Sequence, residues 1–299
     1  MPRLIAIIVT YNPDEDGLLE QIESIVREDI GVVLVDNASA RFPIFKERVA
    51  RLGSGILDLV QSPENVGLAQ AQNIGIETAR MHRPSHVIFF DQDSIPETGF
   101  SSALLAAEST LIQAGTPFSA VGPATFDPVT GQPYPITKYA GPFIRRHVPK
   151  GNMLVEATFL ISSGSLVRME VLDRVGPMRA ELFIDYIDVE WCLRARGLGY
   201  RCYVASGARM SHRIGDARIR VFGRSISAHS PLRRYYLLRN SFLMLRLSYI
   251  PFSYKVREIV LNFLRFSVFL YLSNERRKYL SMMKKAVFDG MSGKYGKFS

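Results

Sequence analysis

The sequence predicts an α/β fold in which helices cover both faces of a mostly parallel β-sheet. Between Arg3 and Val121 the chain repeats a short apolar run, a turn and a helical segment, and this alternation is typical of parallel sheets. Several of the apolar runs end in polar residues, at the edge where such sheets bind ligands. With 299 residues, 47% of them hydrophobic, the chain is long enough to bury a large core.

Five apolar runs in the first half are expected to be strands, with helices between them. The predicted strands are Leu4–Val9, Val32–Asp36, Ile56–Val60, His86–Asp91 and Ser119–Val121. The helices are expected to begin near Asp14, Pro43, Val66 and Glu97, where helical periodicity follows turn residues. The first run lacks the basic region and cleavage site of a signal peptide, so we interpret it as a strand.

The second half begins with a less regular stretch. Residues 125–150 contain several Pro and Gly, which predicts a loop or a hairpin. A strand, a turn of small residues at Ser162–Ser165 and a helix are expected next. A further helix, ended by Gly197 or Gly199, precedes a final strand. Its expected apolar face consists of Ile187, Trp191, Leu193 and Leu198.

The basic charge of the chain is confined to its C-terminal part. Residues 231–299 contain 14 Lys or Arg and 3 Asp or Glu, whereas the remainder contains 23 and 25. Basic and large apolar residues alternate there, and no uncharged apolar run reaches the ~18 residues that span a bilayer. We expect helices that lie on a membrane surface, or that complete the core or a homodimer interface. No nucleic-acid motif accompanies the charge, so nucleic acid is not an expected partner.

Two carboxylates after the fourth predicted strand are the strongest chemical signal. Asp91 and Asp93, with Gln92 between them, follow the apolar run HVIFF, and alternate side chains of an extended segment share a face. Two hard oxygen ligands suit Mg2+ or Mn2+, whose coordination is often completed by substrate phosphates. A solvated strand end that caps the next helix is the simpler alternative. The polar ends of the earlier strands favour the metal site.

A histidine and three acidic residues later in the chain extend this prediction. His212 follows the last predicted strand and can return to the same sheet edge as a third metal ligand, or it can be an ordinary hydrogen-bonded histidine. Asp185, Asp188 and Glu190 lie at a helix start, where acidic residues often only complement the helix dipole. One of them can instead act as a general base, and Asp188 is the best placed.

The ordered motifs VTYNP, VDNAS, NVGLAQAQNIGI, FFDQDS, SSG, DYIDVEWCLR and SHRIG resemble those of inverting family 2 glycosyltransferases. The resemblance extends from about Arg3 to Gly215 and is greatest to bacterial rhamnosyltransferases. It implies a GT-A fold, which is a Rossmann-like nucleotide-binding domain with a mostly parallel sheet. We therefore expect a catalytic domain over residues 1–220, with a nucleotide-sugar half (1–122) and an acceptor half (123–220). A basic helical extension is expected over residues 221–299.

The resemblance also implies roles for individual residues. The donor-binding set would be Thr10, Tyr11, Asn12, Asp36, Asn37, Asn65, Gly67, Asn73, Asp91 and Gln92. Asp91, Asp93 and His212 would hold the metal ion, and Asp188 would be the catalytic base. Many relatives have Glu where this chain has Ile187, which leaves Asp185 and Glu190 as alternatives to Asp188. Ser163, Gly164 and Trp191 are expected to contact the acceptor.

The resemblance further implies transfer of L-rhamnose from dTDP-β-L-rhamnose to a hydroxyl of a lipopolysaccharide core, an O-antigen or another cell-surface glycan. The expected location is the cytoplasm, at the inner face of the bacterial inner membrane. Two buried cysteines without metal-ligand spacing, Cys192 and Cys202, are consistent with a reducing compartment.

Three alternatives to this reaction remain at the level of sequence. The donor can be a UDP-hexose or a galactofuranose nucleotide, or the chain can be a binding module for nucleotide sugars or glycans. A phosphatase of the haloacid dehalogenase type also uses an Asp-x-Asp pair. That chemistry requires the pair after the first strand, whereas here it follows the fourth.

Overall fold

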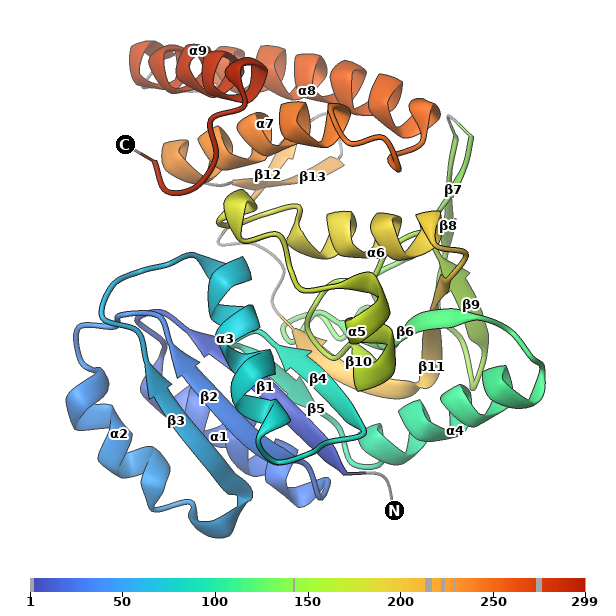
Figure 1. The fold of residues 1–299 in the computed structure, drawn as a ribbon. Coiled ribbons are helices and arrows are strands. Elements are labelled where there is room, and N and C mark those ends of the chain that lie inside the picture. The colour runs from blue at the N-terminus through green and yellow to red at the C-terminus, as the bar shows by residue number, and fades with distance from the viewer. Residues whose placement is uncertain are drawn as a thin grey trace.

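The computed structural model describes residues 3–141, 143–212, 217–221, 224–228, 230–272 and 276–298. Its main sheet has nine strands in the order β3-β2-β1-β4-β10-β6-β11-β5, with β9 paired to β11 (Figure 1). The strands of this sheet are β1 (Leu4–Thr10), β2 (Gly31–Asp36), β3 (Ile56–Gln61), β4 (His86–Phe90), β5 (Ser94–Pro96), β6 (Phe118–Phe126), β9 (Leu154–Ala157), β10 (Leu166–Arg168) and β11 (Arg201–His212).

The central strands are buried on both faces because helices cover both sides of the sheet. Every residue of β1 is buried, and alternate residues such as Ile7 and Ile8 belong to the two different core clusters. One face packs against α3 (Leu68–Arg80), α5 (Met169–Val175) and α6 (Ile187–Gly197); the other packs against α1 (Glu15–Arg27), α2 (Phe42–Ala50) and α4 (Phe100–Gln113). The continuous apolar character of β1 therefore reflects burial on two sides.

The five strands predicted for the first half are present, and the predicted helices lie between them. Parallel pairing joins β3, β2, β1 and β4, whereas β10 is antiparallel to both β4 and β6. The expected hairpin excursion contains β7 (Ile136–Ala140) and β8 (Phe143–His147). The expected apolar face of α6 is wrong at Leu198, which is the C-cap residue and is 56% exposed.

The C-terminal part of the chain forms a layer of helices above the sheet domain (Figure 1). The hairpin β12 (Ala217–Val221) and β13 (Arg224–Ala228) precedes α7 (Pro231–Leu245), α8 (Phe252–Leu272) and α9 (Arg276–Ser292), so helical structure begins at Pro231 and not at residue 221. A short 3-10 helix, η2 (Ala180–Leu182), lies between α5 and α6. Among the described residues, no helix is both long and apolar enough to cross a membrane.

Candidate active site

One large cavity lies at the carboxyl ends of the central parallel strands. Its volume is about 830 Å³, which is within the range of small-molecule sites. It is bordered by the ends of β1, β4 and β11, the start of α3 and the loop before α6. The predicted site residues that line it are Thr10, Tyr11, Asn37, Asn65, Gly67, Asp91, Gln92, Asp93, Asp185, Asp188 and His212.

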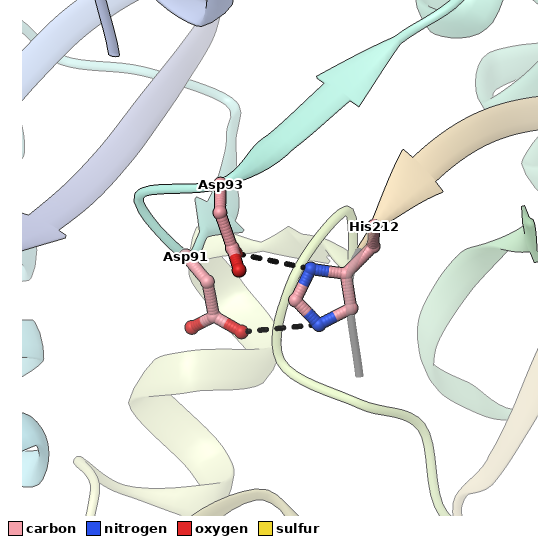
Figure 2. Close-up of side chains that lie close together, drawn as sticks. All are labelled: Asp91, Asp93 and His212. Atoms are coloured by element: carbon pink, nitrogen blue, oxygen red, sulfur yellow. Dashed lines mark ion pairs between the residues drawn. The ribbon is translucent and has the colours of Figure 1, made fainter. Parts of the chain in front are cut away.

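The two aspartates of the Asp-x-Asp pair meet His212 at this cavity. Figure 2 shows Asp91 just after β4, Asp93 just before β5 and His212 at the end of β11, with all three side chains pointing toward one another. The distance from His212 Nε2 to Asp91 Oδ2 is 3.8 Å, and that from His212 Nδ1 to Asp93 Oδ1 is 3.2 Å. Strand pairing fixes this arrangement, because His212 is the register partner of Ser94.

A chain of hydroxyl groups orients the imidazole ring. The Asp91 amide donates to Ser163 Oγ, which donates to Ser94 Oγ, and Ser94 Oγ lies 2.7 Å from His212 Nδ1. Ser94 and Ser163 are both fully buried. A ring held through one nitrogen has a fixed orientation for its other nitrogen, as is common for metal-binding histidines. Ser163, which we expect to contact the acceptor, forms hydrogen bonds with Asp91 and Ser94 in this group.

The electrostatics of the group favour a bound cation. Burial raises the pKa of the Asp91 carboxyl, and the Asp93 carboxylate raises it further, while His212 and Arg233 lower it. Burial lowers the pKa of His212, but Asp93 and Asp91 more than compensate and leave it raised. One ligand atom from each of the three side chains lies within 4.8 Å of the others. Two carboxylates and an imidazole are a suitable donor set for Mn2+, so the residues fit a divalent metal ion.

Backbone and side-chain amides form a second wall of the cavity. Asn37 Nδ2 donates to Asn65 Oδ1 over 3.1 Å, and Asn37 Oδ1 accepts from the Val66 amide over 2.9 Å. Gly67 has φ = +85°, and a Cβ atom there would lie 2.7 Å from the Phe183 carbonyl oxygen. A residue other than glycine would therefore be strained and would clash, which explains Gly67 beside the loop before α6.

Hydrogen bonds connect the carboxyl ends of β1 and β2 next to the cavity. Thr10 Oγ1 donates to Asp36 Oδ1 over 3.1 Å, and the Ser39 amide donates to Asp36 Oδ2 over 2.8 Å. Asp36 is fully buried and borders a smaller neighbouring cavity together with Asn12. Tyr11 is exposed, and its amide donates to Gln92 Oε1 over 2.8 Å, which fixes the loop after β4 to the loop after β1.

The predicted base, Asp188, lies in the first turn of α6, after an unusual loop. Phe183, Asp185 and Tyr186 all have φ values near +65°, a region that residues other than glycine rarely adopt. Burial, together with the Asp91 and Asp185 carboxylates, raises the pKa of Asp188 to about 6 although the Val189 amide lowers it. A carboxyl group with such a pKa is suited to accept a proton near neutral pH.

The two alternative bases have other partners. Glu190 is fully buried, forms an ion pair with Arg194 and accepts a hydrogen bond from Tyr249 Oη. It does not line the cavity. Asp185 does line it, but its Oδ1 atom lies 3.3 Å from Arg233 Nε in an ion pair. Asp188 lines the cavity and has a raised pKa, which favours it as the base.

Several predicted residues lie outside the main cavity. Asn73 donates to the Met178 carbonyl and accepts from the Met178 amide, so it attaches α3 to a neighbouring loop. Trp191 is buried, and its indole N–H donates to the Gly176 carbonyl. Gly164 has φ = +81° and packs against Pro123. None of these three described residues lines the main cavity.

Three residues outside the predicted set lie at the cavity or contact its predicted metal ligands. Arg233 lines the cavity from α7, Ser94 contacts His212, and Tyr186 lines the cavity beside Asp188. Ser94 follows Asp93 and Tyr186 follows Asp185 in the sequence, so their position next to predicted site residues could have indicated that they lie at the site. Arg233 belongs to the basic C-terminal part, where it is one of 14 Lys or Arg residues, and no local pattern distinguishes it.

Comparison with known proteins decides the family. The family model described as Glycosyl transferase family 2 matches residues 5–176. The chain is 34% identical over 296 residues to dTDP-rhamnosyl transferase RfbF of Shigella flexneri, covering 97% of this chain and 96% of that protein. The chain belongs to the family 2 glycosyltransferases. This glycosyltransferase is also 29% identical over 198 residues to an uncharacterised protein of Mycobacterium tuberculosis, covering 64% of this chain and 67% of that one.

Solved structures agree on the fold of this glycosyltransferase. GalNAc-T7 in complex with UDP, GalNAc and Mn2+ is similar with a TM-score of 0.60 and 15% identity, covering 98% of this chain and 58% of that one. TarS 1–349 of S. aureus in complex with UDP-GlcNAc has a TM-score of 0.56 and 16% identity, covering 96% and 81%. The fold is therefore GT-A, as the sequence motifs predicted.

Proposed function

We propose that this glycosyltransferase transfers L-rhamnose from dTDP-β-L-rhamnose, with inversion, to a hydroxyl of a lipopolysaccharide core, an O-antigen or another cell-surface glycan. The observation that carries the proposal is a single cavity lined both by the Asp91, Asp93 and His212 group and by Asp188. The choice of donor is supported by the 34% identity to RfbF over almost the full length of both chains.

The proposed donor site uses the polar ends of the strands. Thr10, Tyr11, Asn37 and Asn65 border the part of the cavity nearest β1 and β2, where a nucleoside would bind. Asp91, Asp93 and His212 would hold Mg2+ or Mn2+ beside the diphosphate. When bound, such an ion neutralises charge on the diphosphate leaving group as a Lewis acid.

The protein's own part in the chemistry is proton removal. The Asp188 carboxylate would accept the proton of the acceptor hydroxyl as its oxygen attacks the anomeric carbon of the sugar. The bond from that carbon to the diphosphate oxygen breaks, and both bonding electrons leave with the nucleoside diphosphate. Attack opposite the leaving group inverts the anomeric centre, so dTDP-β-L-rhamnose would give an α-L-rhamnoside.

The test of the reaction compares donors and one active-site variant. Purified protein is incubated with Mn2+, an acceptor glycan and either dTDP-rhamnose, a UDP-hexose or UDP-galactofuranose, and products are identified by mass spectrometry. We expect rhamnose transfer, and we expect Asp188→Asn to bind dTDP but to lose transfer by a factor of about 100 or more. Transfer only from a UDP-sugar would exclude the proposed donor. If the wild type binds the donor but transfers no sugar, the chain is a binding module. If it releases phosphate from phosphate esters, it is a phosphatase.

We further propose that the chain binds the cytoplasmic face of the bacterial inner membrane through α8. The distribution of polar and apolar side chains around this helix is the reverse of that in a normal surface helix. Its inner face carries Tyr254, Arg257 and Glu258, all buried. Its outer face carries large apolar side chains at helical spacing, namely Phe252, Val256, Ile259, Val260, Phe263, Leu264 and Tyr271.

The inner polar residues of α8 contact groups within the protein, although the guanidinium nitrogens of Arg257 have no hydrogen-bond partner among the described residues. Glu258 Oε2 accepts from Tyr186 Oη over 2.6 Å, and the Arg257 guanidinium lies 3.4 Å from the Tyr139 ring centroid. These contacts fix the rotation of the helix, so its apolar face must point outward. Apolar exposure on this scale marks an interaction surface.

Charge favours an anionic lipid surface as the partner. Phe252 and Tyr271, near the two ends of α8, are 79% and 77% exposed, and aromatic side chains are favoured at membrane interfaces. Arg265 is half-exposed on α8, and the adjacent α9 begins with exposed Arg276 and Arg277. Each basic residue near an anionic bilayer contributes about 1 kcal/mol to binding.

The membrane proposal is tested with vesicles. The wild type is expected to sediment with vesicles of phosphatidylcholine and phosphatidylglycerol, and Phe263→Glu with Val260→Glu should abolish this. Ile44→Glu, which changes an exposed apolar residue on α2, is the matched control and should bind normally. The alternative outcome is that the wild type does not bind vesicles but forms a dimer in solution, and that the double variant is monomeric. That result would show that the α8 face is a homodimer interface.

A further inference from the structure

The first turn of α7 brings a basic side chain into the cavity that holds the predicted catalytic groups. Arg233 lines this cavity together with Asp91, Asp93 and Asp188. It originates in α7 of the C-terminal helical layer and is the last lining residue along the chain, after His212 (Figure 1).

The charge balance of the cavity needs such a cation. Its lining contains four carboxylates, those of Asp91, Asp93, Asp185 and Asp188. Of the described residues that line it, Arg233 is the one Lys or Arg. A nucleoside diphosphate that enters this space brings further negative charge near these carboxylates. A divalent ion held by Asp91, Asp93 and His212 would offset part of this charge, and Arg233 is placed to offset more.

Asp185 is one ion-pair partner of Arg233, and the printed contact between them is longer than that of a strong ion pair. Nε and Nη2 of Arg233 each lie 3.3 Å from Asp185 Oδ1. Charge-assisted bonds between a guanidinium and an oxyanion are typically 2.7–2.9 Å long. Both nitrogens therefore share a single carboxylate oxygen at long distance, and an anion with two suitably placed oxygens can replace it.

The backbone around this pair is firmly held. The Arg233 amide donates to the side chain of Ser230, which caps α7. Asn240, two turns further along α7, is fully buried and donates to the carbonyls of Leu182, Ile184 and Asp185. Because α7 and the loop before α6 are fixed to each other, Arg233 can exchange partners by moving its side chain alone.

We propose that Arg233 is a donor-binding residue that contacts the diphosphate, and that Asp185 occupies the guanidinium when no donor is bound. This inference rests on the proposed function in requiring a nucleoside diphosphate. The planar guanidinium binds two phosphate oxygens at once, which lysine does not. The C-terminal helices then complete the donor site, and α7 belongs to the catalytic unit.

The test measures nucleotide binding by calorimetry in the full-length protein with Mn2+ present. We expect Arg233→Gln to weaken binding of dTDP at least about tenfold, with unchanged binding of thymidine, which lacks phosphates. Arg233→Lys should recover only part of the loss. Lys284→Gln, which removes an exposed positive charge on α9, is the matched control and should bind dTDP normally.

The variant Asp185→Asn separates diphosphate binding from a purely structural role. If Arg233 binds the diphosphate, removal of its competing partner leaves dTDP affinity unchanged or increased. If the pair only holds the loop, Asp185→Asn weakens dTDP and thymidine binding as Arg233→Gln does, and the proposal is wrong. Normal dTDP affinity in Arg233→Gln also overturns it. A wild type that binds UDP and not dTDP contradicts the proposed donor, and the same comparison is then made with UDP.

Discussion

Asp188 has the property that a general base needs, since burial and nearby carboxylates raise its pKa to about 6. Only the ionised carboxylate can accept a proton. We therefore expect kcat/KM to be constant above pH 7 and to fall about tenfold per pH unit below pH 6. Steady-state rates between pH 5 and pH 8 measure this dependence. A profile without this acidic limb would remove Asp188 from the rate-determining proton transfer.

The same shift predicts that Asp188 destabilises the fold. Its pKa of about 6 in the folded chain is above the ~3.9 of an unfolded aspartate, so its favourable contribution exists below pH ~4 and is lost as pH rises through 6. Asp188→Asn should therefore stabilise the chain by on the order of 1 kcal/mol at pH 7.5, and by less at pH 5. Thermal unfolding measures this, with exposed Asp29→Asn as the control. An equal loss of stability at both pH values would contradict it.

Ser94 should matter for metal affinity although it is not a predicted ligand. Its hydroxyl lies 2.7 Å from His212 Nδ1 and accepts a hydrogen bond from Ser163. Loss of a group that orients a ligating histidine typically weakens metal binding 10–100-fold. We expect Ser94→Ala to weaken Mn2+ binding, measured by calorimetry, by roughly that factor. Ser109→Ala, on the exposed side of α4, should bind Mn2+ as the wild type does.

At the scale of elements, the loop before α6 depends on α7. Phe183, Asp185 and Tyr186 have positive φ values, which are unfavourable for residues other than glycine. Asn240 Nδ2 donates to the carbonyl of Leu182, at the end of η2, and to those of Ile184 and Asp185 in this loop, over 2.8 to 3.1 Å. The hydrogen bonds stabilise a conformation that the loop sequence alone does not favour, and they bring Asp188 to the cavity.

Asn240→Ala should therefore affect catalysis as well as stability. We expect a loss of stability of about 1–3 kcal/mol, because buried carbonyls lose their donors, and a fall in kcat because the approach to Asp188 is no longer fixed. The neighbouring Ser241→Ala is the control, since Ser241 is equally buried but donates to Leu238 within its own helix. A kcat as high in Asn240→Ala as in Ser241→Ala would show that the loop is held by other contacts.

Secondary structure was predictable for elements with a simple pattern. The strands β1, β2 and β4 are buried on both faces, so their sequences are continuous apolar runs. The extent of β11 was harder to predict, because it runs from Arg201 to His212 with a register shift between Ala205 and Arg209. Bulges interrupt the two-residue period, but this extra length is what carries His212 to Ser94.

At the scale of the whole molecule, the C-terminal helices are integral to the proposed site. The side chain of Arg239 in α7 is 1% exposed and donates to the carbonyls of Leu182 and Gly296. Tyr236 stacks on Phe183 with ring centroids 5.1 Å apart. The segments 1–220 and 221–299 follow each other in sequence, but these contacts pack them together. We therefore do not expect them to be independent folding units.

Removal of α7, α8 and α9 should disable the catalytic domain. A chain that ends at residue 229 lacks Arg233 and Asn240, and it exposes Phe183. We therefore expect this chain to have lower thermal stability and to lose dTDP binding. Calorimetry and thermal unfolding test this against the full-length chain. Normal dTDP affinity in the shortened chain would show that the helices only bind membrane or protein.

The sequence by itself determined the fold class, the family and the groups that can do chemistry. Asp91, Asp93 and Asp188 were identifiable because each lies in a short motif, and local spacing reports local geometry. Only the tertiary structure decided which polar residues share a cavity. Asn73 and Trp191 do not line the cavity, whereas Arg233 does. The reason is physical: contacts between residues far apart in sequence depend on how helices pack, and no local pattern encodes that.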